Sequence, residues 1–108
     1  MANQFKNQGT ANIGTTATTV YTAPASTTST VIGLTLCNTY TAAVYASVIV
    51  TINGSDFYLI KSALIPVGGA LVPVGGEQKL VLEAADLVKI SSSVASSVDA
   101  IISVLEIS

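Results

Sequence analysis

The dipeptide Asn53-Gly54 lies between two runs of residues in which side chains on alternate positions differ in polarity. These runs cover 43–52 and 55–62, and the first has the longest series of apolar residues at every second position. A two-residue type I′ turn needs positive φ at both central residues, which Asn and Gly adopt more readily than other residues. The pattern predicts a β-hairpin in which Tyr45 lies on the face opposite the core.

The composition favours strands along the rest of the chain. Thr, Val and Ile make up 36 of the 108 residues, and β-branched side chains suit a pleated sheet better than a helix. Further strands are predicted at 17–23, 30–38, 79–83, 87–91 and 98–107. With turns about every 8 to 12 residues, the chain is predicted to be all-β, an antiparallel β-sandwich or a jelly-roll-like barrel of six to eight short strands.

Two of these strands have apolar residues that assign their faces. In 30–38, Ile32, Leu34 and Leu36 are predicted to share the apolar face, with Cys37 on the other. The last strand is apolar on both faces: Val98, Ala100, Ile102 and Val104 form one face, and Ile101, Leu105 and Ile107 form the other. Such a strand is expected in the centre of a sandwich or at a subunit interface.

The N-terminal residues differ from the rest, because 1–10 are polar and rich in Asn and Gln, with Phe5 as the only aromatic residue. We predict an extended N-terminal arm over 1–12 and a single β-sandwich domain over 13–108. An arm of this length reaches about 40 Å, far enough to touch a neighbouring subunit. A frayed terminus is the alternative.

A tandem element follows the hairpin, with Ile-Pro-Val-Gly-Gly at 65–69 and Val-Pro-Val-Gly-Gly at 72–76. A seven-residue spacing seen twice is too short for a solenoid repeat. We therefore predict a turn, a short edge strand and a second turn, which keeps each proline off the interior ladder.

The residues needed for common catalytic and metal chemistry are scarce. The sequence has no histidine, so neither a Ser-His-Asp nor a Cys-His arrangement can form. Its single cysteine, Cys37, can make neither an intrachain disulfide nor a cysteine zinc site. Glu83 and Asp86 are close in sequence but have no calcium-loop pattern around them. We predict no catalytic residues, no metal, no cofactor and no enzymatic activity.

The charge and hydropathy of the sequence also limit the classes of partner that the chain is expected to bind. Only 9% of residues are charged, the net charge is −2, and no arginine is present, so nucleic acid is not an expected partner. Residues 1–10 contain no apolar core of a signal peptide, and the longest apolar stretch, 42–50, is about half a membrane span. We expect synthesis in a cytoplasm and no membrane insertion. So few charges favour a chain whose surface is largely covered by other subunits.

The candidate interface residues are apolar or aromatic residues outside the predicted core. Tyrosine is favoured at interfaces because its ring is apolar and its hydroxyl polar, although simple core packing is the alternative for the tyrosines. The candidate set is Phe5, Ile13, Tyr40, Tyr45, Ile101, Leu105 and Ile107.

Three segments carry a resemblance to a known class of proteins. These are Gly14–Ala25 (GTTATTVYTAPA), Tyr58–Gly69 (YLIKSALIPVGG) and Lys79–Asp86 (KLVLEAAD), the last followed by Ser103–Ile107 (SVLEI). Together they resemble small virion structural proteins of tailed bacteriophages, especially marine and cyanobacterial phages. One departure is Ala85, where a glycine is expected before the aspartate.

The resemblance implies a structural component of the virion. The expected function is a capsid decoration or cement protein that bridges and stabilises capsomers, as a homotrimer bound to the phage major capsid protein. A tail, neck or fibre-associated protein bound to tail proteins is the alternative, as is a surface carbohydrate-binding module. Either implied virion position, on the capsid surface or the tail, is compatible with synthesis in the host cytoplasm.

Overall fold

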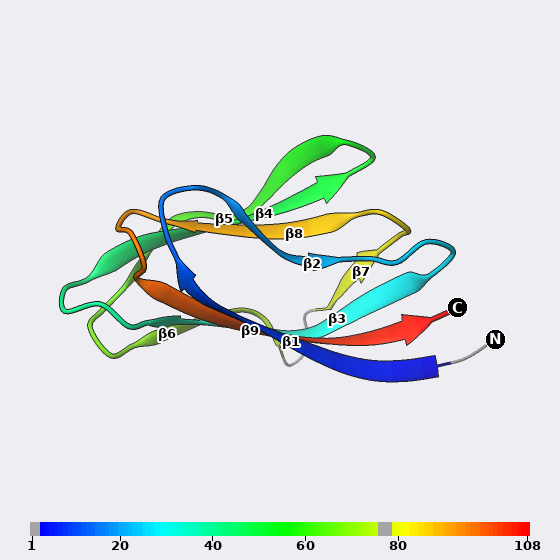
Figure 1. The fold of residues 1–108 in the computed structure, drawn as a ribbon, viewed down its shortest axis with the longest axis horizontal. Coiled ribbons are helices and arrows are strands. Elements are labelled where there is room, and N and C mark those ends of the chain that lie inside the picture. The colour runs from blue at the N-terminus through cyan, green and yellow to red at the C-terminus, as the bar shows by residue number, and fades with distance from the viewer. Residues whose placement is uncertain (1–2, 76–78) are drawn as a thin grey trace.

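The computed structural model describes residues 3–75 and 79–108, which form two antiparallel sheets packed face to face (Figure 1). The strands are β1 (Asn3–Ile13), β2 (Thr18–Thr22), β3 (Thr28–Asn38), β4 (Val44–Ile52), β5 (Ser55–Ile65), β6 (Ala70–Val74), β7 (Leu80–Leu82), β8 (Leu87–Ser92) and β9 (Val98–Ile107). Sheet A has the order β1-β9-β3-β6, with β7 also paired to β3, and sheet B has the order β2-β8-β4-β5. This order is that of a jelly-roll sandwich, so the predicted all-β class is confirmed.

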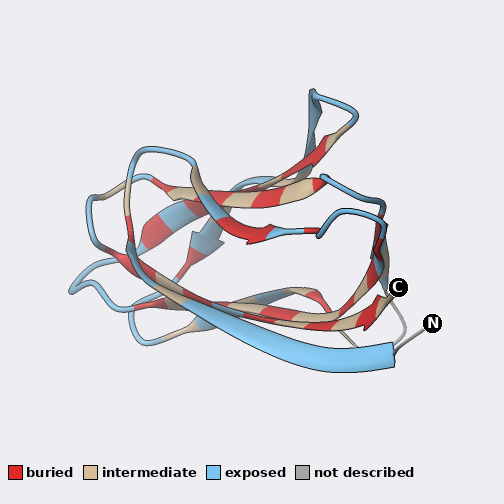
Figure 2. Cartoon of the chain, turned by 45° about the vertical axis from the view of Figure 1, so that its right-hand side comes forward, coloured by how far each residue is buried: buried red, intermediate tan, exposed pale blue. Residues whose placement is uncertain are grey.

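The core lies between the sheets and follows the alternation that the sequence predicts. In β9, Ala100, Ile102 and Val104 are buried, whereas Ile101 on the opposite face is exposed. The strand β4 repeats this pattern, with Val48 buried and Tyr45 exposed. Figure 2 shows buried bands alternating mainly with bands of intermediate exposure along the central strands. The alternation of apolar side chains at every second residue therefore identifies the inner face of both sheets.

The predicted inner face of β3 is wrong at one position. The pairing of β3 with β9 shifts register between Val31 and Gly33, which is the mark of a β-bulge. As a result Val31 is fully buried, and Ile32 is half-buried rather than aligned with Leu34 in the core. A bulge adds one residue without changing the apolar pattern, so alternation alone places the residues before it on the wrong face.

The hairpin between β4 and β5 is confirmed. Ile52 pairs directly with Ser55, and the two residues between them have the positive φ values of a type I′ turn, 52° at Asn53 and 80° at Gly54. The local turn chemistry thus fixes this connection. In Figure 1 the hairpin extends beyond the rest of sheet B.

The first copy of the tandem element is a turn followed by an edge strand, as predicted. The Gly69 amide donates to the Pro66 carbonyl at 2.9 Å, and Gly68 has a φ of 69°. Pro73 lies in β6, which pairs only with β3 among the described strands. The second turn of the element includes Gly76, which lies outside the described residues.

A tight turn joins β7 to β8 at 83–86. The Asp86 amide donates to the Glu83 carbonyl at 3.0 Å, and the Asp86 carboxylate accepts from the Glu83 amide at 2.9 Å. Ala85 has a φ of 71°, in the region that costs an L-residue about 1 kcal/mol or more. Ala85 therefore adopts a backbone conformation that glycine would adopt without this strain.

We expect Ala85→Gly to raise the free energy of unfolding by about 0.5 kcal/mol, since relief of the left-handed strain exceeds the added freedom of the unfolded chain. The matched control is Ala84→Gly. Ala84 is exposed in the same turn but does not have positive φ, so its replacement should lower stability by about the same amount. Urea unfolding followed by circular dichroism measures both changes, and equal effects of the two variants would contradict the strain at Ala85.

The residues predicted to form an extended arm are extended, but they form strand β1. Asn3–Thr10 pairs without interruption with Ile107–Ala100 of β9, and residues 3–9 are all exposed (Figure 2). They add the ninth strand to the eight or fewer that we predicted. Contact between these residues and another subunit remains a prediction.

Candidate functional site

An apolar row crosses the outer face of sheet A, on the side away from sheet B. Phe5 of β1 lies directly opposite Leu105 of β9. Leu105 lies opposite Thr30 of β3, which in turn lies opposite Val81 of β7. Directly paired residues of antiparallel strands share a face, so register alone aligns these side chains. Phe5 is 73% exposed, although it is the largest side chain in the row.

Further apolar side chains, exposed or half-buried, extend this row along the sheet. We define the outer face of sheet A by its six large apolar residues, Phe5, Val72, Val81, Ile101, Leu105 and Ile107. Among the described strand positions on this side, Asp99 is the only charged residue, and its carboxylate accepts from the Asn12 amide at 3.0 Å. The face therefore has little charge to desolvate if another molecule covers it.

The surface beside Phe5 is hollowed. A shallow depression of about 300 Å³ is lined by residues that include Phe5, Ile32 and Ser103. The side chain of Ile32 reaches this depression because the bulge in β3 displaces it from the core. The outer face thus combines a protruding aromatic ring with a recess that has both apolar and polar walls, Lys6 and Asn7 included, and a complementary partner can fit such a shape.

The structure brings four of the seven candidate interface residues together: Phe5, Ile101, Leu105 and Ile107 all lie on the outer face of sheet A. Tyr45 lies on the outer side of sheet B opposite Leu64, and Tyr40 lies in the loop before β4. Ile13 is 1% exposed in the core of the chain itself. It is held there because its carbonyl accepts from the Ser97 amide at 3.0 Å.

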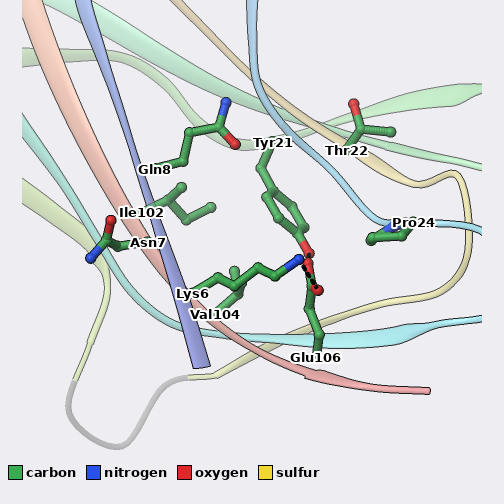
Figure 3. A pocket seen from close by; sticks show the side chains of 9 residues that line it. All are labelled: Lys6, Asn7, Gln8, Tyr21, Thr22, Pro24, Ile102, Val104 and Glu106. Carbon is green, nitrogen blue, oxygen red and sulfur yellow. Dashed lines mark hydrogen bonds and ion pairs between the residues drawn. The ribbon is translucent and has the colours of Figure 1, made fainter. Parts of the chain in front are cut away.

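A second candidate site is a polar pocket of about 220 Å³ between β1 and β2, at the side where both sheets end (Figure 3). Its walls include Lys6, Gln8, Tyr21 and Glu106. Tyr21 comes from sheet B, whereas Lys6 and Glu106 come from sheet A. The pocket therefore lies at the seam between the layers.

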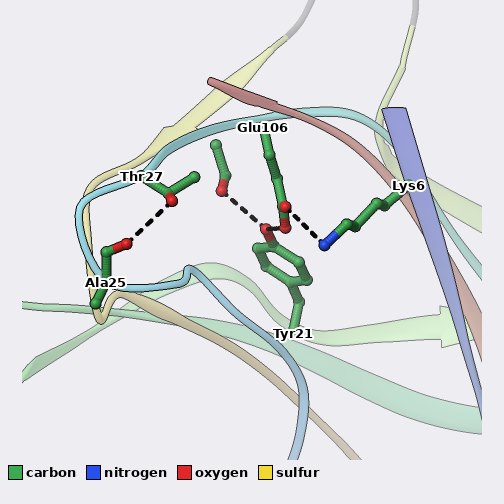
Figure 4. Close-up of polar contacts among 6 residues, drawn as sticks. Lys6, Tyr21, Ala25, Thr27 and Glu106 are labelled. Carbon is green, nitrogen blue, oxygen red and sulfur yellow. Dashed lines mark hydrogen bonds and ion pairs between the residues drawn. The ribbon is translucent and has the colours of Figure 1, made fainter. Parts of the chain in front are cut away.

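Four side chains in and beside this pocket form a continuous polar network (Figure 4). The Tyr21 hydroxyl donates to Glu106 Oε2 at 2.5 Å, and Lys6 Nζ lies 3.0 Å from Glu106 Oε1. Ser29 Oγ lies 2.8 Å from the Tyr21 oxygen. Because the Tyr21 proton is directed at Glu106, the Ser29 hydroxyl is the donor in that bond. The network joins β2 to β1, β3 and β9.

The network shifts the pKa of two groups in opposite directions. The hydrogen bond from Tyr21 holds the pKa of Glu106 below its usual value, and the hydrogen bond and positive charge of Lys6 act in the same direction. Burial, followed by the bond to Glu106, raises the pKa of Tyr21 to about 12. Near neutral pH the pair is therefore a carboxylate bound by a protonated tyrosine.

This arrangement is suited to holding the sheets together. A tyrosine with a raised pKa keeps its proton, and a carboxylate with a lowered pKa is a weak base, so neither shift favours proton transfer at neutral pH. The pocket is also smaller than the roughly 300 to 1,000 Å³ of most small-molecule sites. Within residues 3–75 and 79–108, no three Cys, Asp or Glu side chains gather as metal ligands would.

Sequence reasoning did not identify Val72, Val81 or the Tyr21–Glu106 pair. The sequence pattern does mark Glu106, because in β9 it occupies the next core-facing position after Ile102 and Val104. A carboxylate at a core-facing position indicates a buried charge with a partner. No such signal marked Tyr21, which lies 85 residues away in the chain.

No protein-family model matches the sequence, and no curated protein is significantly similar to it. The fold is similar to that of a protein from Bacillus endospore appendages, which are disulfide-linked pili. The TM-score is 0.60 at 13% identity, over 97% of this chain and 85% of that chain. A chain of the T13 viral particle of IBDV has a TM-score of 0.48 at 10% identity, over 96% of this chain and 35% of the viral chain. At these identities the pilus protein shows a shared fold.

The described part of the chain contains no helix with the length and apolar character needed to cross a membrane.

Proposed function

We propose that this chain is a non-enzymatic structural protein of a bacteriophage virion, and that it decorates the capsid as a cement protein bridging and stabilising capsomers. The observation that carries the proposal is the outer face of sheet A, a nearly uncharged apolar surface on one layer of a two-sheet sandwich. The three phage-like sequence segments support the virion assignment. The fold shared with a pilus protein supports a role in assembly.

The physical basis of bridging is burial of apolar area, which contributes about 25 cal/mol per Å² removed from water. Exposed groups such as Phe5 and Ile101 stand on paired strands, so little conformational freedom is lost when a partner covers them. The partner proposed for this face is the major capsid protein. Decoration at three-fold points of a capsid would place three copies around each point.

A tail, neck or fibre position is the alternative, and it would use the same face with a tail protein as partner. The two positions are distinguished by mixing the purified chain with purified heads and, separately, with purified tails of a phage carrying this protein. Co-sedimentation with heads supports the cement role. Co-sedimentation with tails alone would replace it by the tail role.

We expect Ile101→Glu to weaken binding to heads at least tenfold, since the new carboxylate would be buried without a partner. The matched control is Leu64→Glu. Ile101 is 60% exposed on sheet A and Leu64 is 55% exposed on sheet B, so both variants should fold while only the first changes the proposed interface. Co-sedimentation at several concentrations measures the difference, and equal binding of Ile101→Glu and the unmodified chain would refute the outer-face proposal.

A further inference from the structure

We propose that the free edge of β1 pairs antiparallel with β1 of a second copy of this chain, across a twofold axis that passes through Asn7. The inference rests on the proposed function, because it names one contact through which the module assembles. This edge contact joins copies in pairs along β1, and Phe5 is the one residue that it shares with the outer face of sheet A.

The edges of the two sheets differ in how well they are protected against pairing. Unprotected edges are long, flat and free of proline, whereas short strands, prolines and bulges block a second strand. β2 and β7 are short, and β6 contains Pro73. β5 is long, but its pairing with β4 shifts register twice and Ser62 has a φ of 51°. Only β1 among these edges keeps one register over eight consecutive residues, Asn3–Thr10.

The one charged residue of β1 is not available to repel another strand. A lysine on an edge strand ordinarily discourages pairing by its charge. Lys6 instead extends toward the seam between the sheets (Figure 3), where its Nζ lies 3.0 Å from Glu106 Oε1. Its charge is therefore matched within the same chain. The free edge is left with uncharged Asn, Gln, Gly and Thr residues around Phe5.

The second copy is identified by the fit of β1 to itself. In the proposed pair, the outer faces of both copies lie on the same side of the joined sheet. Directly opposed residues share a face. The twofold axis must therefore pass through a residue that opposes its own copy, and not through a peptide bond. An axis through Lys6 would place Phe5 opposite Asn7 and Gly9 opposite Asn3, so the aromatic ring would cover no glycine. An axis through Asn7 opposes Lys6 to Gln8, and axes farther along the strand shorten the paired segment.

The register with Asn7 on the axis also gives a role to Phe5, the most exposed of the large apolar side chains. It places Phe5 directly opposite Gly9 of the second copy, so the ring can cover the backbone that glycine leaves bare. Aromatic residues stabilise strand glycines in this way across a sheet. Phe5 and Gly9 lie on the same face of β1, as their pairing with Leu105 and Ile101 shows.

The test uses disulfide formation between strands, in a background in which Cys37 is replaced by serine. With Asn7→Cys, the two new thiols face each other on the axis, and we expect most of the chain to become a covalent dimer under mild oxidation. The matched control, Thr15→Cys, places a thiol at an exposed position outside the strands and should remain monomeric. Non-reducing gel electrophoresis distinguishes the two results.

The register is tested with Phe5→Cys and Gly9→Cys. Each alone should cross-link poorly, and an equal mixture of the two should give disulfide-linked heterodimers. A Cβ at Gly9 meets only the Ala100 carbonyl oxygen, at 4.0 Å, so this variant should fold. Efficient cross-linking of Phe5→Cys with itself would overturn the Asn7 axis.

The inference and the proposed function fail in different ways. If Asn7→Cys stays monomeric while the Cys37→Ser parent binds heads and Ile101→Glu weakens that binding, β1 pairing is wrong and the proposed function stands. If Asn7→Cys dimerises while the parent binds neither heads nor tails, the edge contact stands and the virion role is wrong.

Discussion

Replacing Asn38 with aspartate is expected to lower the free energy of unfolding by about 3 to 5 kcal/mol. The Asn38 side chain is buried at the end of β3, where its Nδ2 donates to the Ala42 carbonyl at 2.9 Å and to the Ile65 carbonyl at 3.0 Å. Its Oδ1 accepts from the Tyr40 amide at 2.8 Å. One side chain thus ties the loop before β4 to the end of β5.

Aspartate keeps the size of asparagine but loses both N–H donors. Its carboxylate would face the carbonyl oxygens of Ala42, Ile65 and Pro66, all of which accept from Asn38 Nδ2. A buried charge with no donor on that side costs several kcal/mol, a large share of the roughly 5 to 15 kcal/mol that stabilise a typical domain. Urea unfolding followed by circular dichroism measures the loss.

Two controls separate charge from hydrogen bonding. Asn38→Ala removes the same bonds without adding a charge, so we expect a smaller loss of about 2 to 3 kcal/mol. Thr39→Asp adds the charge at the neighbouring exposed position and should change stability by less than about 0.5 kcal/mol. A loss below about 1 kcal/mol for Asn38→Asp would show that the loops do not depend on this side chain.

The features that the sequence predicts correctly are those set by neighbouring residues. The hairpin at Asn53-Gly54 depends on the φ values of two adjacent residues. The inward series of β9 depends on the alternation of side chains along one strand. The bulge at Val31 and Ile32 is not predicted, because extra residues are revealed only by the partner strand.

The candidate interface residues show the same difference between features set by neighbouring residues and features set by distant strands. Apolarity alone marks Ile101 and Leu105 as the second face of β9, and both lie on the outer face of sheet A. Phe5 joins them only through the pairing of β1 with β9, between residues about a hundred positions apart in the chain. Ile13 follows a polar segment in sequence, but its apolar side chain is buried because the chain enters the sandwich at that residue.

The polar network at the seam predicts a stability that falls on both sides of neutral pH. The pKa of Glu106 is lowered in the folded chain, so its contribution is complete above the unfolded value, about 4.3, and is lost as the pH falls through the folded value. The pKa of Tyr21 is raised from 10.0 to about 12. Its contribution is complete below the unfolded value and is lost as the pH rises from about 10 to 12.

Tyr21→Phe should remove the alkaline dependence and the largest part of the acid dependence, while Lys6 continues to lower the pKa of Glu106. The substitution keeps the ring in the core but removes the hydroxyl that donates to Glu106 and accepts from Ser29, so we expect a loss of about 1.5 to 3 kcal/mol at pH 7. The difference between the unmodified chain and Tyr21→Phe should be largest between about pH 5 and 10 and should shrink toward both extremes.

Urea unfolding from pH 3 to 11 measures this difference. Tyr58→Phe is the control, because Tyr58 is exposed on β5 with its ring 5.2 Å from Lys61 Nζ, a contact that phenylalanine retains. A constant difference between the unmodified chain and Tyr21→Phe at every pH would mean that the hydroxyl only fills space. A difference that shrinks at both extremes means that the bond from Tyr21 to the Glu106 carboxylate holds the two sheets together where β1 and β2 meet.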